Sequence, residues 1–165
     1  MPEEQSVTLL DTPAAVGAAV LHARVQPATQ PWLEELLGSG SRRGSLLLVD
    51  DDSGLREILQ SVLEREGHRV HTAGNGLQGL RLAKVLRPEL IVLNFLMPVM
   101  DGLSALRALK KDPIISYLKV VMYSAVSDFD RFRGESLEAG AVDCLHTPFE
   151  LKTFVAVVER ALRAR

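Results

Sequence analysis

The chain has 165 residues, of which 47% are hydrophobic and 24% are charged, and its formal net charge is −2. This composition is typical of a globular protein, and the nearly balanced charge does not indicate a nucleic acid or a membrane surface as a partner. The chain has one cysteine, Cys144, which excludes an internal disulfide framework and favours a reducing compartment.

Residues 1–44 are predicted to form an N-terminal extension. They begin with MPEEQ, which is acidic where a secretion signal is basic, and Ala14 to Val25 is too short and too polar to span a bilayer, which takes roughly 20 apolar residues. The stretches DTPAAVGAAVLHARV and PWLEELL have the capping and proline residues of short helices, and GSGSRRG is typical of a flexible linker. We therefore expect a partly helical extension, no membrane contact and a cytoplasmic location.

From Ser45 onwards, apolar runs alternate with segments of helical periodicity. Helical spacing first appears at Leu55, Ile58, Leu59 and Val62 and ends with a closing helix that carries Phe154 and Val158. The runs that predict strands are SLLLVD, HRVHTA, LIVLN, KVVMYSA and AVDCLH. This alternation predicts an α/β domain over residues 45–165, with a five-stranded, doubly wound parallel sheet and helices on both faces.

Polar side chains follow four of the predicted strands, at the points where the strands end. In sheets of this kind, ligands bind beyond the carboxyl ends of the strands, so these side chains are the candidate functional residues. They are Asp50, Asp51, Asp52, Asn94, Ser124 and Thr147.

Four motifs carry a resemblance to a known family. In order and spacing, LLLVDDDSGLREIL, LNFLMPVMDG, VVMYSAVS and GAVDCLHTPFE resemble the receiver domain of response regulators in two-component signalling, over about 45–165. The resemblance implies a flavodoxin-like fold. It implies that Asp50 and Asp51 are the acidic pair that helps to hold Mg²⁺, and that Ser124 is the hydroxyl that contacts the phosphoryl group. Pro148 matches the proline that follows a phosphoryl-binding lysine in the family.

Three residues depart from the family pattern. Asn94 stands where the family has the phosphoacceptor Asp, Thr147 replaces the lysine, and Cys144 replaces the aromatic switch residue. The amide of Asn94 lacks the charge of a nucleophilic carboxylate, and Thr147 lacks the ammonium that would neutralise phosphoryl charge. The two losses offset each other in charge. We therefore expect a degenerate receiver, or pseudo-receiver, that has no catalytic residue and is not an enzyme.

The metal site is expected to be weak or lost, because Mg²⁺ prefers charged oxygen ligands and Asn94 offers only a neutral one. We therefore predict no cofactor, with weak Mg²⁺ binding at Asp50 and Asp51 at most. A purely structural interpretation remains open for each residue. Asn94 would cap its loop, Asp50 and Asp51 would cap the next helix or bind loop amides, and Ser124 would bond at a strand end. Cys144 would be a small buried hydrophobe.

The predicted function is phosphorylation-independent signalling through protein–protein contacts in a phosphorelay pathway. In the family, partners often meet the face formed by the fourth helix, fifth strand and fifth helix, here residues 128–139, Cys144 and residues 150–163; residues 1–44 are a second candidate surface. The chain shows no helix-turn-helix and no basic stripe, so we expect no nucleic acid as a partner. Two alternatives are a residual switch that responds to Mg²⁺ or an anion, and a structural subunit that forms homo-oligomers through residues 1–44.

Overall fold

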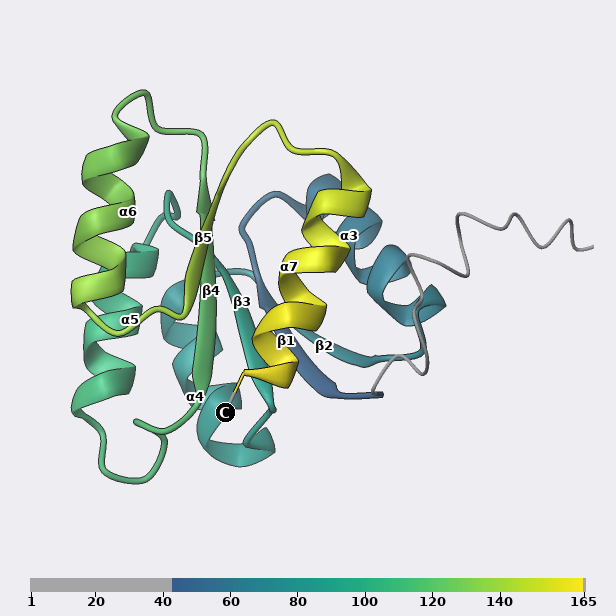
Figure 1. The fold of residues 1–165 in the computed structure, drawn as a ribbon. Helices are drawn as coiled ribbons and strands as arrows, with labels where there is room; N and C mark the ends of the chain where they lie inside the picture. Colours follow the sequence, from purple (N-terminus) through teal and green to yellow (C-terminus); the bar gives the residue numbers. More distant parts are fainter. Residues whose placement is uncertain (1–42, 165) are drawn as a thin grey trace, which may run out of the picture. The chain divides into compact units, whose positions relative to one another are not determined.

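The structure is a computed structural model that describes residues 43–164. The predicted N-terminal extension, residues 1–44, lies almost wholly outside the described residues, and its helices and its role in assembly stay predictions. Element labels follow Figure 1. Within the described range, no helix has the length and apolar character that crossing a membrane requires.

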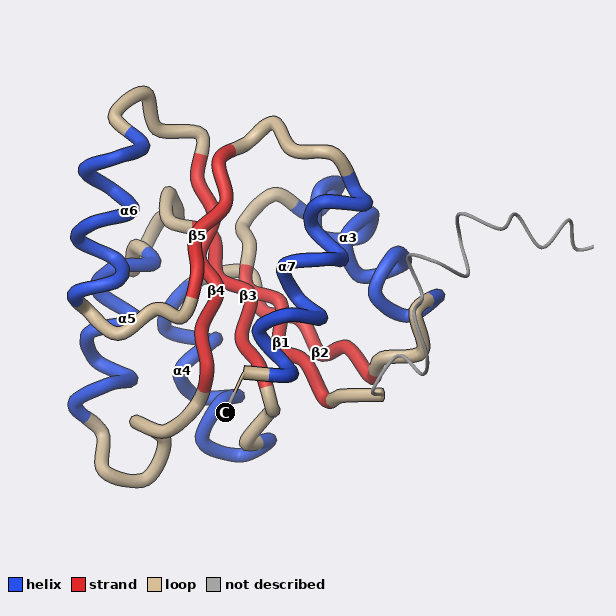
Figure 2. Tube along the Cα trace, in the orientation of Figure 1, coloured by secondary structure: helices blue, strands red, loops and turns tan. Residues whose placement is uncertain are grey.

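The sheet has five parallel strands in the order β2-β1-β3-β4-β5 (Figure 2). This arrangement confirms the fold class predicted from the alternation of strands and helices. The order reverses between β1 and β3, and such a switch point leaves a crevice for functional residues beyond the carboxyl ends of the strands. The strands are β1 (Ser45–Val49), β2 (Arg69–Ala73), β3 (Leu90–Asn94), β4 (Lys119–Ser124) and β5 (Asp143–His146).

Helices cover both faces of the sheet. Figure 1 shows two of them, α3 and α7, on one face and the other three on the opposite face. Every strand is therefore connected to the next by a helical crossover, as the parallel strands require. The helices are α3 (Ser53–Arg65), α4 (Gly76–Leu86), α5 (Gly102–Lys111), α6 (Phe129–Glu138) and α7 (Leu151–Arg163).

Two apolar cores result from the alternation of side chains along the strands. In β1, Leu47 and Val49 pack towards α4, α5 and α6, whereas Leu46 and Leu48 pack towards α3 and α7. All four side chains are buried, because helices cover the sheet on both sides. Burial of one such side chain contributes about 1.5–3 kcal/mol relative to exposure, so the central strands fix the sheet edge that carries the polar residues.

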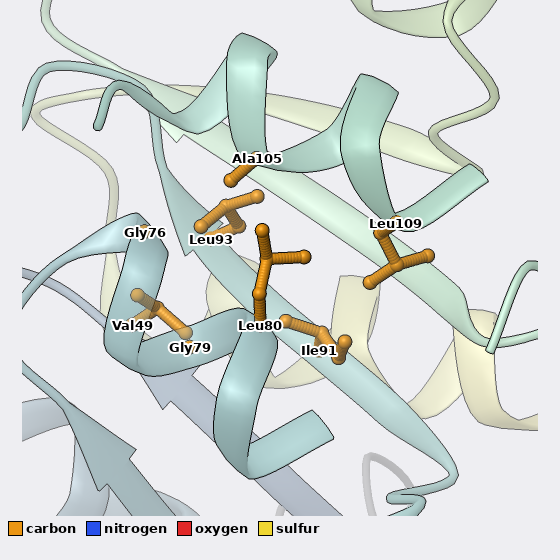
Figure 3. Close-up of a pocket in the computed structure, with 8 residues that line it drawn as sticks. All are labelled: Val49, Gly76, Gly79, Leu80, Ile91, Leu93, Ala105 and Leu109. Carbon is orange, nitrogen blue, oxygen red and sulfur yellow. The ribbon is translucent and has the colours of Figure 1, made fainter. Parts of the chain in front are cut away.

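The core beneath α4 and α5 contains one small gap (Figure 3). Its volume is about 10 Å³, and it is lined by Val49, Gly76, Gly79, Leu80, Ile91, Leu93, Ala105 and Leu109. A space of this size is at the lower limit for a single water molecule, and its lining is apolar. The gap is therefore a packing defect of the core and not a ligand site.

Candidate functional site

The carboxyl edge of the sheet brings three of the predicted site residues into direct contact. Asp50 and Asp51 follow β1, and Asn94 is the last residue of β3, the strand that pairs with β1. Ser124 ends β4, and Thr147 follows β5. The contacts among these residues are unequal, and they divide the edge into a hydrogen-bonded part and an apolar part.

Asn94 joins β3 to the acidic loop through its amide nitrogen. This nitrogen lies 3.1 Å from Asp50 Oδ1, 3.4 Å from Asp51 Oδ1 and 3.1 Å from the carbonyl oxygen of Leu96. All three neighbours are acceptors, so the nitrogen and not the oxygen of the amide must face them. Asn94 thus shares its two N–H donors among two carboxylates and a backbone carbonyl.

Asp50 is a fully buried carboxylate, and hydrogen bonds compensate for its loss of contact with water. Its side chain is 0% exposed, and its Oδ1 also accepts the backbone N–H of Asp52 at 2.9 Å. Its Oδ2 accepts the hydroxyl of Tyr123. Burial raises the pKa of Asp50, and the hydrogen bonds from Tyr123, Asp52 and Asn94 oppose that rise. The carboxylate is therefore held in place by donors from three separate parts of the chain.

Tyr123 is a site residue that the sequence analysis missed. It lies on β4 next to Ser124, is 1% exposed, and packs edge-on against Phe149 with the ring centroids 5.9 Å apart. Burial and the negative charge of Asp50 raise the pKa of Tyr123 far above its usual range, so the hydroxyl stays a neutral donor. The sequence does contain a signal for this role, which is a tyrosine within the apolar run KVVMYSA. A tyrosine hydroxyl that is buried needs a hydrogen-bond partner.

Asn94 is positioned by the junction between the loop that follows β3 and helix α5, at Asp101 and Gly102. A Cβ on Gly102 would lie 2.2 Å from the carbonyl oxygen of Asn94, so only glycine allows the start of α5 to approach β3 this closely. The N–H of Gly102 donates to the carbonyl of Phe95 at 2.8 Å. Asp101 caps α5 by accepting the N–H of Ser104 at 2.8 Å and its hydroxyl at 2.7 Å.

The helix after the acidic pair is capped by the third aspartate. Asp52 accepts the N–H of Leu55 at 3.0 Å and is the N-cap of α3. Asp50 instead accepts a loop amide, as the structural interpretation of the sequence described. Asp51 is exposed, and its hydrogen bond from the Asn94 amide is the long one at 3.4 Å. The three consecutive aspartates therefore have three different roles.

Ser124 and Thr147 belong to the other part of the edge. Ser124 is 1% exposed, and its hydroxyl accepts the N–H of Val126 at 3.3 Å. Its carbonyl accepts the N–H of Thr147 at 2.9 Å. Within residues 43–164, no hydrogen bond joins Ser124 or Thr147 to the acidic pair. Thr147 lines an apolar groove of about 390 Å³ with Leu55, Leu59, Ala125, Pro148, Phe149 and Leu151.

Cys144, at the predicted switch position, lies in the core. It is 8% exposed and packs in the apolar cluster that also contains Phe132 and Ala141. Burial raises the pKa of the Cys144 thiol to about 11, so the thiol is protonated at neutral pH. An uncharged, buried thiol of this kind packs as a small hydrophobic side chain.

The arrangement does not fit the Mg²⁺ that the family resemblance implies. A cation between Asp50 and Asp51 would need their oxygens to face it, but both Oδ1 atoms face the N–H groups of Asn94. In the described part of the chain, no group of three or more His, Cys, Asp or Glu side chains is placed to hold a metal ion. Donors of the protein itself thus engage both oxygens of Asp50 and one oxygen of Asp51.

Comparison with known proteins identifies the class. Residues 46–159 match the family of response regulator receiver domains, and the fold and the polar edge described above agree with that match. The chain therefore belongs to the response regulator receiver domain family, whose members are the receivers of two-component systems.

Individual relatives are similar over the same region. The DNA-binding response regulator MtrA of Mycolicibacterium paratuberculosis is 39% identical over 122 residues, which are 73% of this chain and 52% of that protein. The CpxR homolog of Haemophilus influenzae, a transcriptional regulatory protein, is 40% identical over 119 residues, 72% of this chain and 50% of that protein. The chain thus spans about half the length of these relatives. The receiver domain of NtrX from Brucella abortus superposes with a TM-score of 0.67 at 30% identity, over 73% of this chain and 99% of that one.

These relatives correct one prediction. The sequence analysis expected no nucleic acid as a partner, and the match to DNA-binding response regulators contradicts that expectation. The expectation rested on the balanced charge and on the lack of a helix-turn-helix within 165 residues. In these relatives, however, about half of the protein lies outside the matched region, so the charge of a receiver says nothing about DNA binding elsewhere.

Proposed function

We propose that this chain is a receiver domain that signals without accepting a phosphoryl group and acts through contacts with a protein partner. The observation that supports the proposal is the contact of the Asn94 amide with both Asp50 and Asp51. Asn94 stands at the position where the family places its nucleophile, and here its side chain serves as a hydrogen-bond donor.

The chemistry of phosphoryl transfer supports the same proposal. Formation of an acyl phosphate requires a carboxylate to attack phosphorus, and an amide has no negative charge with which to attack. Transfer also relies on cations that neutralise the charge of the phosphoryl oxygens. Thr147, at the lysine position, lies in an apolar groove and supplies no such charge. In this proposal the chain is not an enzyme, because it does not catalyse its own phosphorylation.

The proposed partner surface is the face formed by α6, β5 and α7, and we expect the protein to act in the cytoplasm. Since no phosphoryl group changes the site, the chain would present one constant conformation to its partner. Signalling would then depend on the amount of the protein or on the state of the partner.

Incubation of the full chain with acetyl phosphate and Mg²⁺, followed by intact mass measurement, tests the proposal. We expect no gain in mass for the natural chain and little for Asn94→Asp, because Thr147 leaves the phosphoryl oxygens without a cation. The variant Asn94→Asp with Thr147→Lys should gain one phosphoryl group when the Mg²⁺ concentration is high enough to fill its weak metal site. A gain by the natural chain, mapped to the peptide that contains Asn94, would contradict the proposal.

A transcriptional output is a second part of the proposal, and the relatives favour it. MtrA is a DNA-binding response regulator, and this chain resembles its receiver region at 39% identity. We infer that the receiver acts on transcription, within its own protein or through a DNA-binding partner. Cross-linking in cells, purification of the chain and sequencing of the attached DNA should show enrichment of particular promoters. A uniform background would count against a transcriptional output.

A further inference from the structure

We propose that Tyr123 is a positioning residue that, together with Asn94, takes the place of a divalent cation at Asp50 and so excludes Mg²⁺ from the site. This inference deepens the proposed function, and it rests on the same degenerate receiver site. In this inference two side chains exclude the cation from Asp50. The family resemblance points to one of them, Asn94, and not to Tyr123.

The first observation that supports the inference is the set of hydrogen bonds that Asp50 accepts. A carboxylate offers about four lone-pair positions. In Asp50, Oδ1 receives the N–H of Asp52 at 2.9 Å and that of Asn94 at 3.1 Å, while Oδ2 receives the hydroxyl of Tyr123. The carboxylate is also 0% exposed. Three of the roughly four lone-pair positions of Asp50 are therefore filled, and each of its two oxygens already receives a hydrogen atom.

The second observation is the register of the sheet, which places the two donors side by side. Asn94 and Tyr123 are direct partners in the β3–β4 pairing, and the N–H of Phe95 donates to the carbonyl of Tyr123 at 2.9 Å. The two side chains therefore start from neighbouring backbone positions and converge on the carboxylate of Asp50, which directly follows β1. Both strands lie inside the sheet, so backbone pairing holds the two Cα atoms at the positions from which each side chain reaches Asp50.

The geometry predicts how the site would bind a metal ion if the carboxylate of the family pattern were restored at position 94. Asn94→Asp would bring back a third carboxylate but would leave the Tyr123 hydroxyl on Asp50 Oδ2. Metal binding should then stay weak until the hydroxyl is also removed. Tyr123→Phe removes that single oxygen and keeps the ring that packs against Phe149.

Titration of the full chain with Mg²⁺, followed by calorimetry, tests the inference. We expect no saturable binding by the natural chain at millimolar concentrations, and weak binding by Asn94→Asp. The variant with both Asn94→Asp and Tyr123→Phe should bind Mg²⁺ at least about tenfold more tightly than Asn94→Asp, which corresponds to about 1.4 kcal/mol. In an Asp50→Asn background, Tyr123→Phe should leave the affinity of Asn94→Asp unchanged, because the hydroxyl acts through Asp50.

The second tyrosine of the described chain provides a matched control. Tyr117 is 64% exposed, so Tyr117→Phe removes the same hydroxyl and should not change the affinity of Asn94→Asp. The inference is overturned if Tyr123→Phe gives no gain, if Tyr117→Phe gives an equal gain, or if the natural chain binds Mg²⁺ as tightly as the double variant.

An NMR titration of the natural chain does not depend on the folding of any variant. The side-chain amide signals of Asn94 should not move when Mg²⁺ is added, and movement with saturation would overturn the inference. The proposed function is tested separately by the mass measurement. A natural chain that binds Mg²⁺ but gains no phosphoryl group would refute this inference and leave the proposed function intact.

Discussion

Two regions of the same sheet edge stabilise their side chains in different ways, one by hydrogen bonds and the other by apolar packing. Where β1, β3 and β4 end, Asp50, Asn94 and Tyr123 form a hydrogen-bonded cluster in which the buried carboxylate receives three donors. Where β4 and β5 end, Thr147 lies in an apolar groove, and Ser124 accepts hydrogen bonds from the backbone of Val126 and Thr147.

The difference shows two ways in which the edge of one sheet is stabilised. Asn94 and Thr147 stand in these two regions, at positions where the family resemblance places a carboxylate and a lysine. In this chain the first region compensates its buried charge with its own donors, because an unpaired buried carboxylate is costly. The second region has no charge to compensate, so apolar packing is sufficient. We therefore expect changes in the first region to have the larger effects on stability.

The largest effect is expected at Gly102. Gly102→Ala places a methyl group against the carbonyl of Asn94, and the resulting shift of the hydrogen-bonded cluster should cost about 3 kcal/mol of unfolding free energy. Urea unfolding monitored by circular dichroism measures this cost. Gly134→Ala is the matched control, because a Cβ there meets nothing within 4 Å in the helix α6. It should stabilise the protein by about 0.5–1 kcal/mol.

A smaller effect is expected at Tyr123. Tyr123→Phe leaves one oxygen of the buried Asp50 carboxylate without a donor, which should cost about 2 kcal/mol at neutral pH. Tyr117→Phe, at the exposed tyrosine, should change stability by less than about 0.5 kcal/mol. Equal losses in the two variants would show that the Asp50 contact contributes nothing to stability.

The cap of α5 should contribute about 1 kcal/mol, with a defined pH dependence. Burial acts to raise the pKa of Asp101, but hydrogen bonds from Ser104 outweigh it and hold that pKa below its usual value. The ionised form therefore stabilises the folded state above the unfolded pKa of about 3.9, and this contribution disappears as the pH falls through the lower folded pKa.

Asp101→Ala should thus lose about 1 kcal/mol at pH 7 and progressively less in acid below about pH 4. Thermal unfolding across this pH range measures the difference. Asp101→Asn is the control, because asparagine also caps helices but does not titrate. A loss for Asp101→Ala that stays constant from neutral pH to strong acid would contradict the role of the ionised cap.

The smallest effect is expected in the apolar region. Within the described chain, the Thr147 hydroxyl makes no side-chain hydrogen bond, and the groove around it is apolar. Thr147→Val keeps the shape of the side chain and should change the unfolding free energy by less than about 0.5 kcal/mol. A loss comparable to that of Tyr123→Phe would mean that the two regions do not differ in the way described above.

Local patterns in the sequence were sufficient to predict the fold and the edge of the sheet at which these polar side chains lie. The apolar runs from SLLLVD to AVDCLH marked the five strands, because a strand buried on both faces is continuously apolar, whereas the helices showed a longer period. Asp50, Asn94 and Thr147 were located because they directly follow such runs. The roles of single polar atoms were not predictable in this way.

Only the tertiary structure decided which of these residues interact. Asp50 and Tyr123 are 73 positions apart and meet because β1, β3 and β4 are neighbours in the sheet. The orientation of the Asn94 amide likewise follows from three acceptors that come from two separate loops. The periodicity of a sequence reports which side of an element is buried, whereas the partner of a buried polar atom depends on strand order and register. The sequence alone thus determined where the polar edge lies, and the packing of the strands decided that its carboxylate is satisfied by the protein itself.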